Sequence, residues 1–400
     1  MAAREVVILG AARTPIGRYG GSFRDVHPAE LGAVAGGSAL ERAGVSADEV
    51  SEVIFGHARQ AGSGPNPARQ VAHRAGVAMS APAYTINKAC ASGMQALVCA
   101  AQSILLGESE CILAGGIESM SCMPYLVDSA DARWGHRMGD FQLVDAMFRD
   151  GFQDPLSGLI MGETAEVLAR QYGITRAESD AFAIESQQKA EAAQKAGYFS
   201  AEIAPVTVDV RGKKTTVGAD EHPRHGTTLD AIARLPLVFP EVEGHPGIIT
   251  AGTSSGITDG GAALVLASDK WAADRGLKPL ARLTGWASAG VDPRIMGIGP
   301  VPAIAKLYER HGLELDSFDL VELNEAFAAQ VLAVLKEAPI PRERLNVNGG
   351  AIALGHPIGC TGARIVVTLL FEMQRRDVAQ GLATLCVSGG MGMALAIERF

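Results

Sequence analysis

Cys90 lies in a segment whose residue types suit nucleophilic chemistry, the run 87–93 (Asn-Lys-Ala-Cys-Ala-Ser-Gly). The run joins a strand-like segment to a helix-like one, and the first turn of a helix presents free N–H groups and a partial positive charge. A thiol with a pKa of ~8.5 is only about 3% ionised at pH 7, and a helix terminus with one basic neighbour can supply the roughly 2 kcal/mol that ionisation needs. We therefore expect Cys90 to be a nucleophile with a lowered pKa; burial as a small apolar side chain is the alternative.

His356 is the second candidate, in the glycine-rich run 348–359 (Asn-Gly-Gly-Ala-Ile-Ala-Leu-Gly-His-Pro-Ile-Gly). A histidine followed by proline, among glycines that leave it little covered, suits a residue that exchanges a proton with a ligand. The glycine spacing resembles a phosphate-binding loop, but His356 and Pro357 stand where Lys and Ser or Thr are required, so that interpretation fails. An exposed loop histidine is the alternative.

Two further candidates end predicted strands. Cys386 opens the run 386–392 (Cys-Val-Ser-Gly-Gly-Met-Gly), whose glycines would let a ligand approach backbone N–H groups. Asn324 begins Asn-Glu-Ala-Phe at the start of a predicted helix, where an exposed N-cap is the alternative. We expect the remaining thiols to serve packing: Cys99, Cys111, Cys122 and Cys360.

Short strand-like and helix-like runs alternate around these residues. Strands are expected at 6–9, 52–55, 111–116, 319–323 and 382–387, and helices at 94–106, 324–336 and 363–375. Helices followed closely by strands favour a parallel sheet covered on both faces. The order strand, Cys90, helix matches the order strand, Asn324, helix, which suggests two copies of one α/β unit.

Residues 121–249 differ in composition from the segments on either side, because Met, Arg, Asp and His lie in expected loops. Two helices are predicted there, at 163–172 before Gly173 and at 175–196, where Thr175 and Glu178 form a capping box. We interpret this stretch as an insertion that covers one face of the paired units and supplies a substrate lid or an oligomer contact.

Composition narrows the class of function. The net charge is −9 and the pI about 5.5, without the basic excess of a nucleic-acid surface. We expect no apolar run to approach the roughly 18 residues that a membrane-spanning helix needs, and therefore no membrane insertion. Six cysteines without a Cys-x-x-Cys pair argue against a structural zinc site and for reduced thiols in the cytoplasm.

Taken together, these runs resemble the thiolase family over nearly all 400 residues. Seven motifs in the family's order carry the resemblance: the Cys90 run, Gly-Gly-Ile-Glu-Ser-Met at 115–120, Thr-Ala-Gly-Thr-Ser-Ser-Gly at 250–256, Met-Gly-Ile-Gly-Pro at 296–300, Asn-Glu-Ala-Phe at 324–327, the His356 run and the Cys386 run.

The resemblance implies an α/β fold in which two similar thiolase-type halves form a five-layer αβαβα body. Residues 1–120 with 250–275 would form the N-terminal half with the nucleophile, and residues 276–400 the C-terminal half with His356 and Cys386. Residues 121–249 would be the inserted loop domain, with coenzyme A binding and oligomer contacts. A homodimer or homotetramer is expected.

The resemblance also implies an acyltransferase that cleaves 3-ketoacyl-CoA by thiolysis, or condenses two acetyl-CoA molecules in reverse. Cys90 would carry the acyl group, His356 would accept its proton, and Cys386 would be the second acid and base. One oxyanion site would combine His356 with a water held by Asn324; the other would combine the backbone N–H groups of Cys90 and Ser388.

Coenzyme A thioesters would be substrates, with no permanently bound cofactor and no metal. Ser255 would contact the pantetheine arm, Arg224 the nucleotide part, and Met161 would lie in the acyl pocket. Three residues depart from the family pattern: Ser388 replaces a glycine, Ile160 a histidine of the acetoacetyl-CoA branch, and Ala231 a serine near the adenine.

Other functions remain to be weighed against this one. A thiolase-like acyl-CoA or lipid-binding protein should lack Cys90, His356 or Cys386, and a 3-ketoacyl synthase should carry a histidine where Cys386 stands. A metalloenzyme lacks support from ligand spacing.

Overall fold

The computed structural model describes residues 4–210 and 212–400, so the first three residues of the predicted N-terminal half and Arg211 lie outside the description. Its main feature is a ten-stranded sheet in the order β14-β15-β16-β13-β1-β12-β5-β3-β4, with the short β2 (Gly17–Arg18) beside β12. The sheet has two halves, because β1 and β13 join only through the pairs Val7–Arg282 and Ile8–Ala281.

The N-terminal half of the sheet is apolar on both faces, and all of β5 and β12 is buried. Helices α1 and α2 cover its outer face, where their apolar side chains pack with those of the strands. The elements of this half are β1 (Val6–Arg13), α1 (Pro28–Ala43), β3 (Glu52–His57), α2 (Pro67–Arg74), β4 (Ala83–Ile86), β5 (Cys111–Ser119), β12 (Thr258–Ser268) and the peripheral α8 (Asp269–Asp274).

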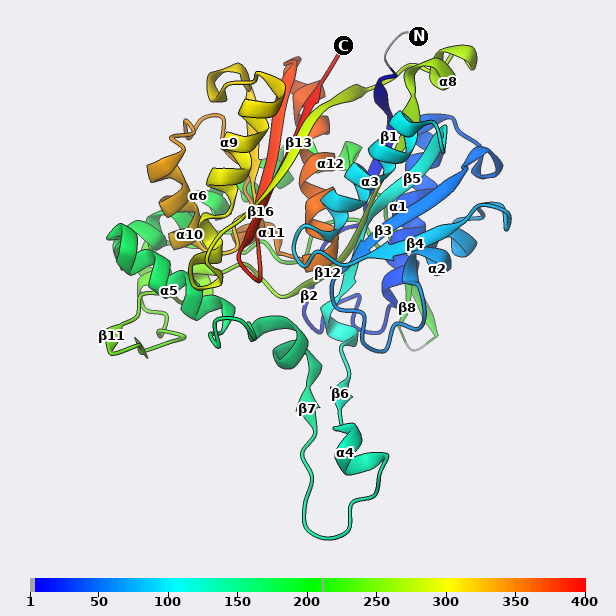
Figure 1. Ribbon diagram of the computed structural model, residues 1–400. Coiled ribbons are helices and arrows are strands. Elements are labelled where there is room, and N and C mark those ends of the chain that lie inside the picture. Colours follow the sequence, from blue (N-terminus) through cyan, green and yellow to red (C-terminus); the bar gives the residue numbers. More distant parts are fainter. Residues whose placement is uncertain (1–3, 211) are drawn as a thin grey trace.

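The C-terminal half repeats this arrangement, with α9 and α10 on the outer side (Figure 1). Its elements are β13 (Ala281–Gly290), α9 (Pro300–His311), β14 (Leu320–Leu323), α10 (Ala328–Glu337), α11 (Ala351–Leu354), β15 (Gln380–Val387) and β16 (Met391–Glu398).

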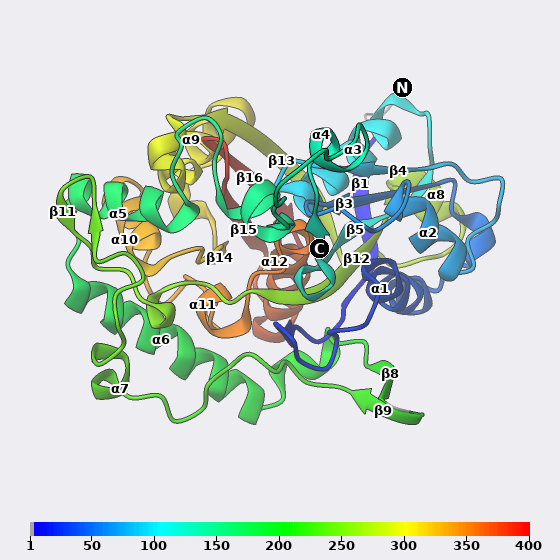
Figure 2. The same cartoon turned by 90° about the horizontal axis from the view of Figure 1, so that it is seen from below.

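Two buried helices, α3 (Ser92–Leu106) and α12 (Ile358–Arg376), lie between the halves and contact both each other and the sheet (Figure 2). One hydrophobic core contains residues of both helices and of both halves of the sheet. The layers are therefore helix, sheet, helix, sheet, helix, as the family resemblance implied. Residues 89–106 are in fact long and apolar enough to cross a membrane, contrary to the expectation, but 61% of that window is buried in this central layer.

The predicted parallel sheet is wrong in detail. Only β3–β4, β3–β5 and β14–β15 pair in parallel, and the other pairings of the sheet are antiparallel. The strands β15 and β16 must be antiparallel because a tight turn with Gly389 and Gly390 at φ of 84° and 81° joins them. The long insertion before β12 likewise lets that strand return in either direction.

The structure contains the internal repeat, but the prediction matched the wrong elements of the two copies, because it paired the segment of Asn324 with that of Cys90. The strand orders β1-β12-β5-β3 and β13-β16-β15-β14 match β14 with β3, and a lone parallel bridge between Val321 and Leu345 takes the place of β4. Helix α12, preceded by His356, is therefore the counterpart of α3, preceded by Cys90. Asn324 follows the counterpart of β3, so it does not correspond to Cys90.

The insertion begins with a long hairpin that projects from the body (Figure 1). It consists of β6 (Tyr125–Leu126), α4 (Ser129–Ala132) and β7 (Val144–Asp145), followed by a π-helical turn at Phe148–Phe152. The predicted helices are α5 (Met161–Tyr172), closed by Gly173 at φ 59°, and α6 (Arg176–Lys195), with the Thr175–Glu178 capping box. The other elements are β8 (Val206–Val210), β9 (Lys213–Val217), α7 (Leu229–Ala233), β10 (Glu241–Val242) and β11 (His245–Pro246).

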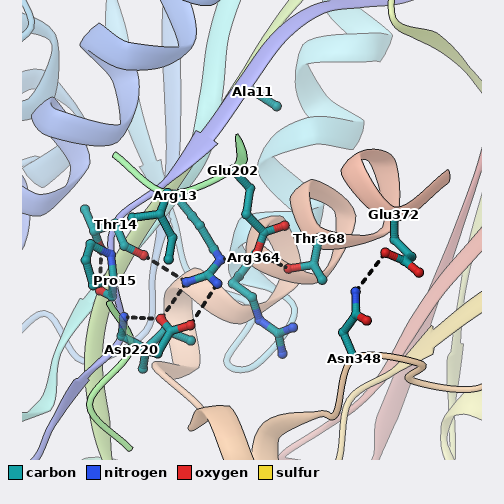
Figure 3. A network of polar contacts seen from close by, with 12 residues as sticks. Ala11, Arg13, Thr14, Pro15, Glu202, Asp220, Asn348, Arg364, Thr368 and Glu372 are labelled. Carbon is teal, nitrogen blue, oxygen red and sulfur yellow. Dashed lines mark hydrogen bonds and ion pairs between the residues drawn. The ribbon is translucent and has the colours of Figure 1, made fainter. Parts of the chain in front are cut away.

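A buried ionic network fastens the insertion to the body (Figure 3). Arg13 of β1 donates to Glu202 at 2.6 Å and to both carboxylate oxygens of Asp220 at 2.7 and 2.9 Å, and Thr368 of α12 donates to Glu202 at 3.2 Å. Two carboxylates offset the desolvation of one buried guanidinium, and loss of a single partner would leave an uncompensated charge. The network fixes the start of the segment 220–224.

Candidate active site

The two central helices approach each other closely near the ends where they begin. A Cβ on Gly93 of α3 would lie 2.8 Å from the backbone nitrogen of Ala363, and one on Gly362 of α12 would lie 2.5 Å from that of Met94. Glycine at both positions therefore allows the contact. It brings together Cys90 and His356, which precede α3 and α12 and both line a cavity of about 760 Å³.

Cys90 lies in a strained turn. Ala89 has φ 44°, which is unusual for a residue with a side chain. The turn is fixed by Ser92, whose hydroxyl accepts from the Lys88 N–H at 2.8 Å and donates to the Ala89 carbonyl at 2.6 Å. Cys90 is only 8% exposed, and what is accessible faces the cavity.

His356 is oriented by Thr361, one turn into α12. The Thr361 hydroxyl donates its single proton to the Pro357 carbonyl at 3.0 Å, so it must accept from His356 Nδ1, which is 2.6 Å away. This assigns the proton to Nδ1 and leaves Nε2 free to accept one. Gly355, at φ 102°, provides the backbone turn before the ring.

The electrostatic surroundings keep this imidazole neutral. Burial lowers the pKa of His356 to about 3, and the positive charges of Arg364 and Arg59 act in the same direction. A neutral imidazole with a free Nε2 is the form that a general base requires.

Cys386, the second-last residue of the strand β15, lines the same cavity and is 1% exposed. Burial raises the pKa of its thiol, and the nearby sulfur of Cys90 adds to the rise. At neutral pH Cys386 is therefore a thiol, the form that can donate a proton.

The expected lowering of the pKa of Cys90 is wrong. Burial raises the pKa of this thiol, although the charge of Arg59 and the backbone N–H groups of Ser388 and Cys90, which hydrogen-bond to the sulfur, act in the opposite direction. The helix terminus is present, but desolvation outweighs it. Cys90 therefore rests as a thiol, and its proton must leave as the sulfur attacks.

Asn324 contacts His356 but does not line the cavity. Its Nδ2 is 3.5 Å from His356 Nε2, and its Oδ1 has no hydrogen-bond partner among the described residues. The side chain is buried at the end of β14, where its backbone N–H donates to the Thr384 carbonyl at 3.0 Å.

Glu118 is a site residue that the sequence argument missed. Its carboxylate is fully buried at the end of β5 and accepts from the backbone N–H of Gly359 at 2.9 Å and of Arg59 at 3.3 Å. It thereby holds the start of α12 against the end of β3. An acidic residue near the end of a buried strand, within the Gly-Gly-Ile-Glu-Ser-Met run, was the available signal.

The three residues predicted to contact coenzyme A or the acyl chain, Met161, Arg224 and Ser255, all line the cavity. Ser388, predicted to supply a backbone N–H to an oxyanion site, and the departure Ile160 line it too. The backbone N–H of Arg224 donates to Gln187 at 2.9 Å, and that of Ser255 to the Ala326 carbonyl at 3.0 Å. The third departure, Ala231, is exposed on α7 and does not line the cavity.

The cavity thus combines two neutral thiols and a neutral imidazole with largely apolar walls, an arrangement suited to transfer of an acyl group between thiols. Within residues 4–210 and 212–400, no group of three or more His, Cys, Asp or Glu residues is placed to hold a metal ion.

Comparisons with known proteins agree with this geometry. Residues 6–270 match the model of the thiolase N-terminal domain and residues 277–399 that of the thiolase C-terminal domain. The acetyl-CoA acetyltransferase of Rhizobium meliloti strain 1021 is 50% identical over 394 residues, 98% of either chain.

Two solved structures superpose over the whole of this chain. The acetyl-CoA acetyltransferase of Bacillus anthracis has a TM-score of 0.96 at 47% identity, with 100% of its chain covered. Human mitochondrial 3-ketoacyl-CoA thiolase in complex with CoA has a TM-score of 0.94 at 41% identity, with 98% covered. The two matched domains, the close full-length relative and the shared fold show that this chain belongs to the thiolase family.

Proposed function

We propose that the protein is a thiolase that transfers acyl groups between coenzyme A thioesters through an acyl-enzyme on Cys90. The observation that carries this proposal is the placement of Cys90, His356 and Cys386 on one cavity. The names of the relatives, acetyl-CoA acetyltransferase and 3-ketoacyl-CoA thiolase, support the same reaction class.

In the first half-reaction, the sulfur of Cys90 attacks the ketone carbon of a 3-ketoacyl-CoA while His356 Nε2 accepts the thiol proton. The bond between the α and β carbons breaks, and the acyl group remains on Cys90. Cys386 donates its proton to the departing enolate of acetyl-CoA. Burial, which raises the pKa of Cys386, supports its role as this proton donor.

In the second half-reaction, Cys386 is restored when it takes the proton of the incoming coenzyme A thiol, and the resulting thiolate attacks the acyl-enzyme. The Cys90 thiolate leaves and recovers its proton from His356. Negative charge develops on a carbonyl oxygen in both halves. The donors that we propose for it are His356 with a water on Asn324, and the N–H groups of Cys90 and Ser388.

The acyl-enzyme can be tested with radiolabelled acetyl-CoA. We expect label on the wild-type protein and on Cys99→Ala, a control in α3 that does not line the cavity, and none on Cys90→Ala. Thiolysis of acetoacetyl-CoA should be lost with the label. Persistent labelling of Cys90→Ala would overturn the assignment of the nucleophile.

Coenzyme A binding is supported by the relative solved in complex with CoA and by the cavity positions of Arg224 and Ser255. We assign Arg224 to the nucleotide part, Ser255 to the pantetheine arm and Met161 to the acyl pocket. Ile160 next to Met161 widens the choice of acyl groups beyond acetoacetyl, because an apolar side chain replaces a polar one.

We also propose that the chain forms a homodimer or homotetramer and acts in the cytoplasm without membrane insertion. The projecting hairpin supports assembly, because five large apolar residues within 19 positions of it are between 52% and 90% exposed: Tyr125, Trp134, Met138, Phe141 and Leu143. Six free cysteines support a reducing compartment. The three-part division at residues 121, 250 and 276 remains part of this proposal.

A further inference from the structure

Arg59 is a buried cation in the wall of the cavity that the mechanism above does not use. It follows β3 and is 6% exposed. Its Nη1 and Nη2 donate to the carbonyls of Asp150 and Gly151 at 2.8 Å each, and its Nε has no hydrogen-bond partner among the described residues.

The charge of Arg59 is poorly compensated compared with that of the other buried arginine that joins the insertion to the body. Arg13 is bound by the carboxylates of Glu202 and Asp220, whereas Arg59 meets only two carbonyl oxygens in the described chain. A guanidinium has five N–H donors, so three of them remain without a protein acceptor here. A buried positive charge without a counter-ion destabilises a protein, unless a ligand supplies the missing negative charge and hydrogen-bond acceptors.

Arg59 lies at the reacting end of the cavity and not at the nucleotide end. Its charge acts on both Cys90 and His356, whereas Arg224, assigned to the nucleotide, is on the insertion. Gly151 packs directly against the guanidinium: a Cβ there would lie 2.9 Å from Nε. Phe152 and Ile160, in the same stretch of the insertion, provide apolar wall on the same cavity.

We propose that Arg59 is a specificity-determining residue that binds a carboxylate at the far end of the acyl chain, so that the preferred substrates are 3-oxoacyl-CoA thioesters of dicarboxylic acids. A guanidinium binds a carboxylate through charge-assisted hydrogen bonds, and a buried cation beside apolar side chains disfavours an uncharged chain that leaves the cation unpaired. This inference rests on the proposed function, since it concerns the acyl group that Cys90 receives.

The test compares two substrates of equal chain length, 3-oxoadipyl-CoA and 3-oxohexanoyl-CoA, in the wild-type protein, in Arg59→Met and in Arg59→Lys. We expect the wild type to prefer the carboxylated substrate in kcat/KM by about 100-fold. In Arg59→Met the preference should disappear because kcat/KM falls for the carboxylated substrate only. Arg59→Lys, which keeps the charge, should retain part of the preference. Arg18→Met, at another cavity-lining arginine that is exposed, should keep the wild-type ratio.

The ratio distinguishes this role from the two others open to Arg59. If Arg59 only anchors residues 150 and 151, or only favours the Cys90 thiolate, Arg59→Met will slow both substrates equally, and the inference is overturned. It is also overturned if the wild type cleaves acetoacetyl-CoA yet prefers 3-oxohexanoyl-CoA or shows no preference. If neither these substrates nor acetoacetyl-CoA is cleaved, the proposed function itself fails.

Discussion

The segments before α3 and α12 occupy equivalent places in the two halves of the molecule, yet they carry opposite chemistry. The first presents a thiol, Cys90, and the second a base, His356, at the start of a central helix. They are also fixed differently: Ser92 bonds the backbone of its own strained turn, whereas His356 depends on Thr361 within its helix and on Glu118 from the other half. One duplicated unit thus supplies both groups of the proposed proton transfer, because the central layer places the two segments at one cavity.

Removal of the proposed base should have the largest effect. We expect His356→Asn to lower the rate of Cys90 acylation by acetyl-CoA by about 1,000-fold, because Cys90 rests as a thiol and His356 is the proposed acceptor of its proton. Rapid-quench measurement of the acyl-enzyme checks this. Acylation at the wild-type rate would show that the Cys90 segment activates its own thiol.

The second sulfur tests whether the two half-reactions separate. Cys386→Ala should still acylate Cys90 but lose carbon–carbon bond turnover by about 100-fold or more, because the enolate then lacks its proton donor. The measurements are acetyl labelling and acetoacetyl-CoA thiolysis on the same preparation. Normal thiolysis would remove Cys386 from the mechanism, and lost labelling would place it in the first step.

Thr361 tests the orientation of His356. In Thr361→Val the Nδ1–H loses its acceptor, and we expect kcat to fall about 10-fold with KM little changed, as for outer partners that fix a histidine tautomer. Ser92→Ala is the matched change in the other half. It should instead change the rate at which alkylating agents modify Cys90. The assigned hydrogen bonds would be contradicted if Thr361→Val kept the wild-type kcat or if Ser92→Ala kept the wild-type rate of alkylation.

The smallest expected effect is on the pH dependence of Cys90 alkylation, which reports whether this thiol is neutral at rest. Burial raises the pKa of Cys90 above the ordinary value for a thiol, so the thiolate fraction, and with it the rate of reaction with iodoacetamide, should still rise beyond about pH 9. The measurement uses a Cys122→Ser background, because Cys122 is exposed. A rate that levels off below pH 8 would restore the lowered pKa inferred from the sequence.

Residue types and local order alone determined much of this protein. The runs around Cys90, His356 and Cys386 singled out three residues that the structure places on one cavity. Glycine signals bounded helices such as α3, which is capped by Gly107. These features depend on side-chain chemistry and on short-range backbone preferences, both of which are set by residues close together in the sequence. The layered fold followed from the family resemblance.

Other properties were decided only when distant segments packed together. The sequence did not predict the pairing of α3 with α12, the antiparallel sheet or the neutral state of Cys90. It also did not predict the burial of Glu118 and Arg59 beside the site. Pairing directions depend on long connections, which sequence patterns constrain weakly. The ionisation of Cys90 depends on how much solvent its neighbours exclude, and those neighbours come from both halves and from the insertion.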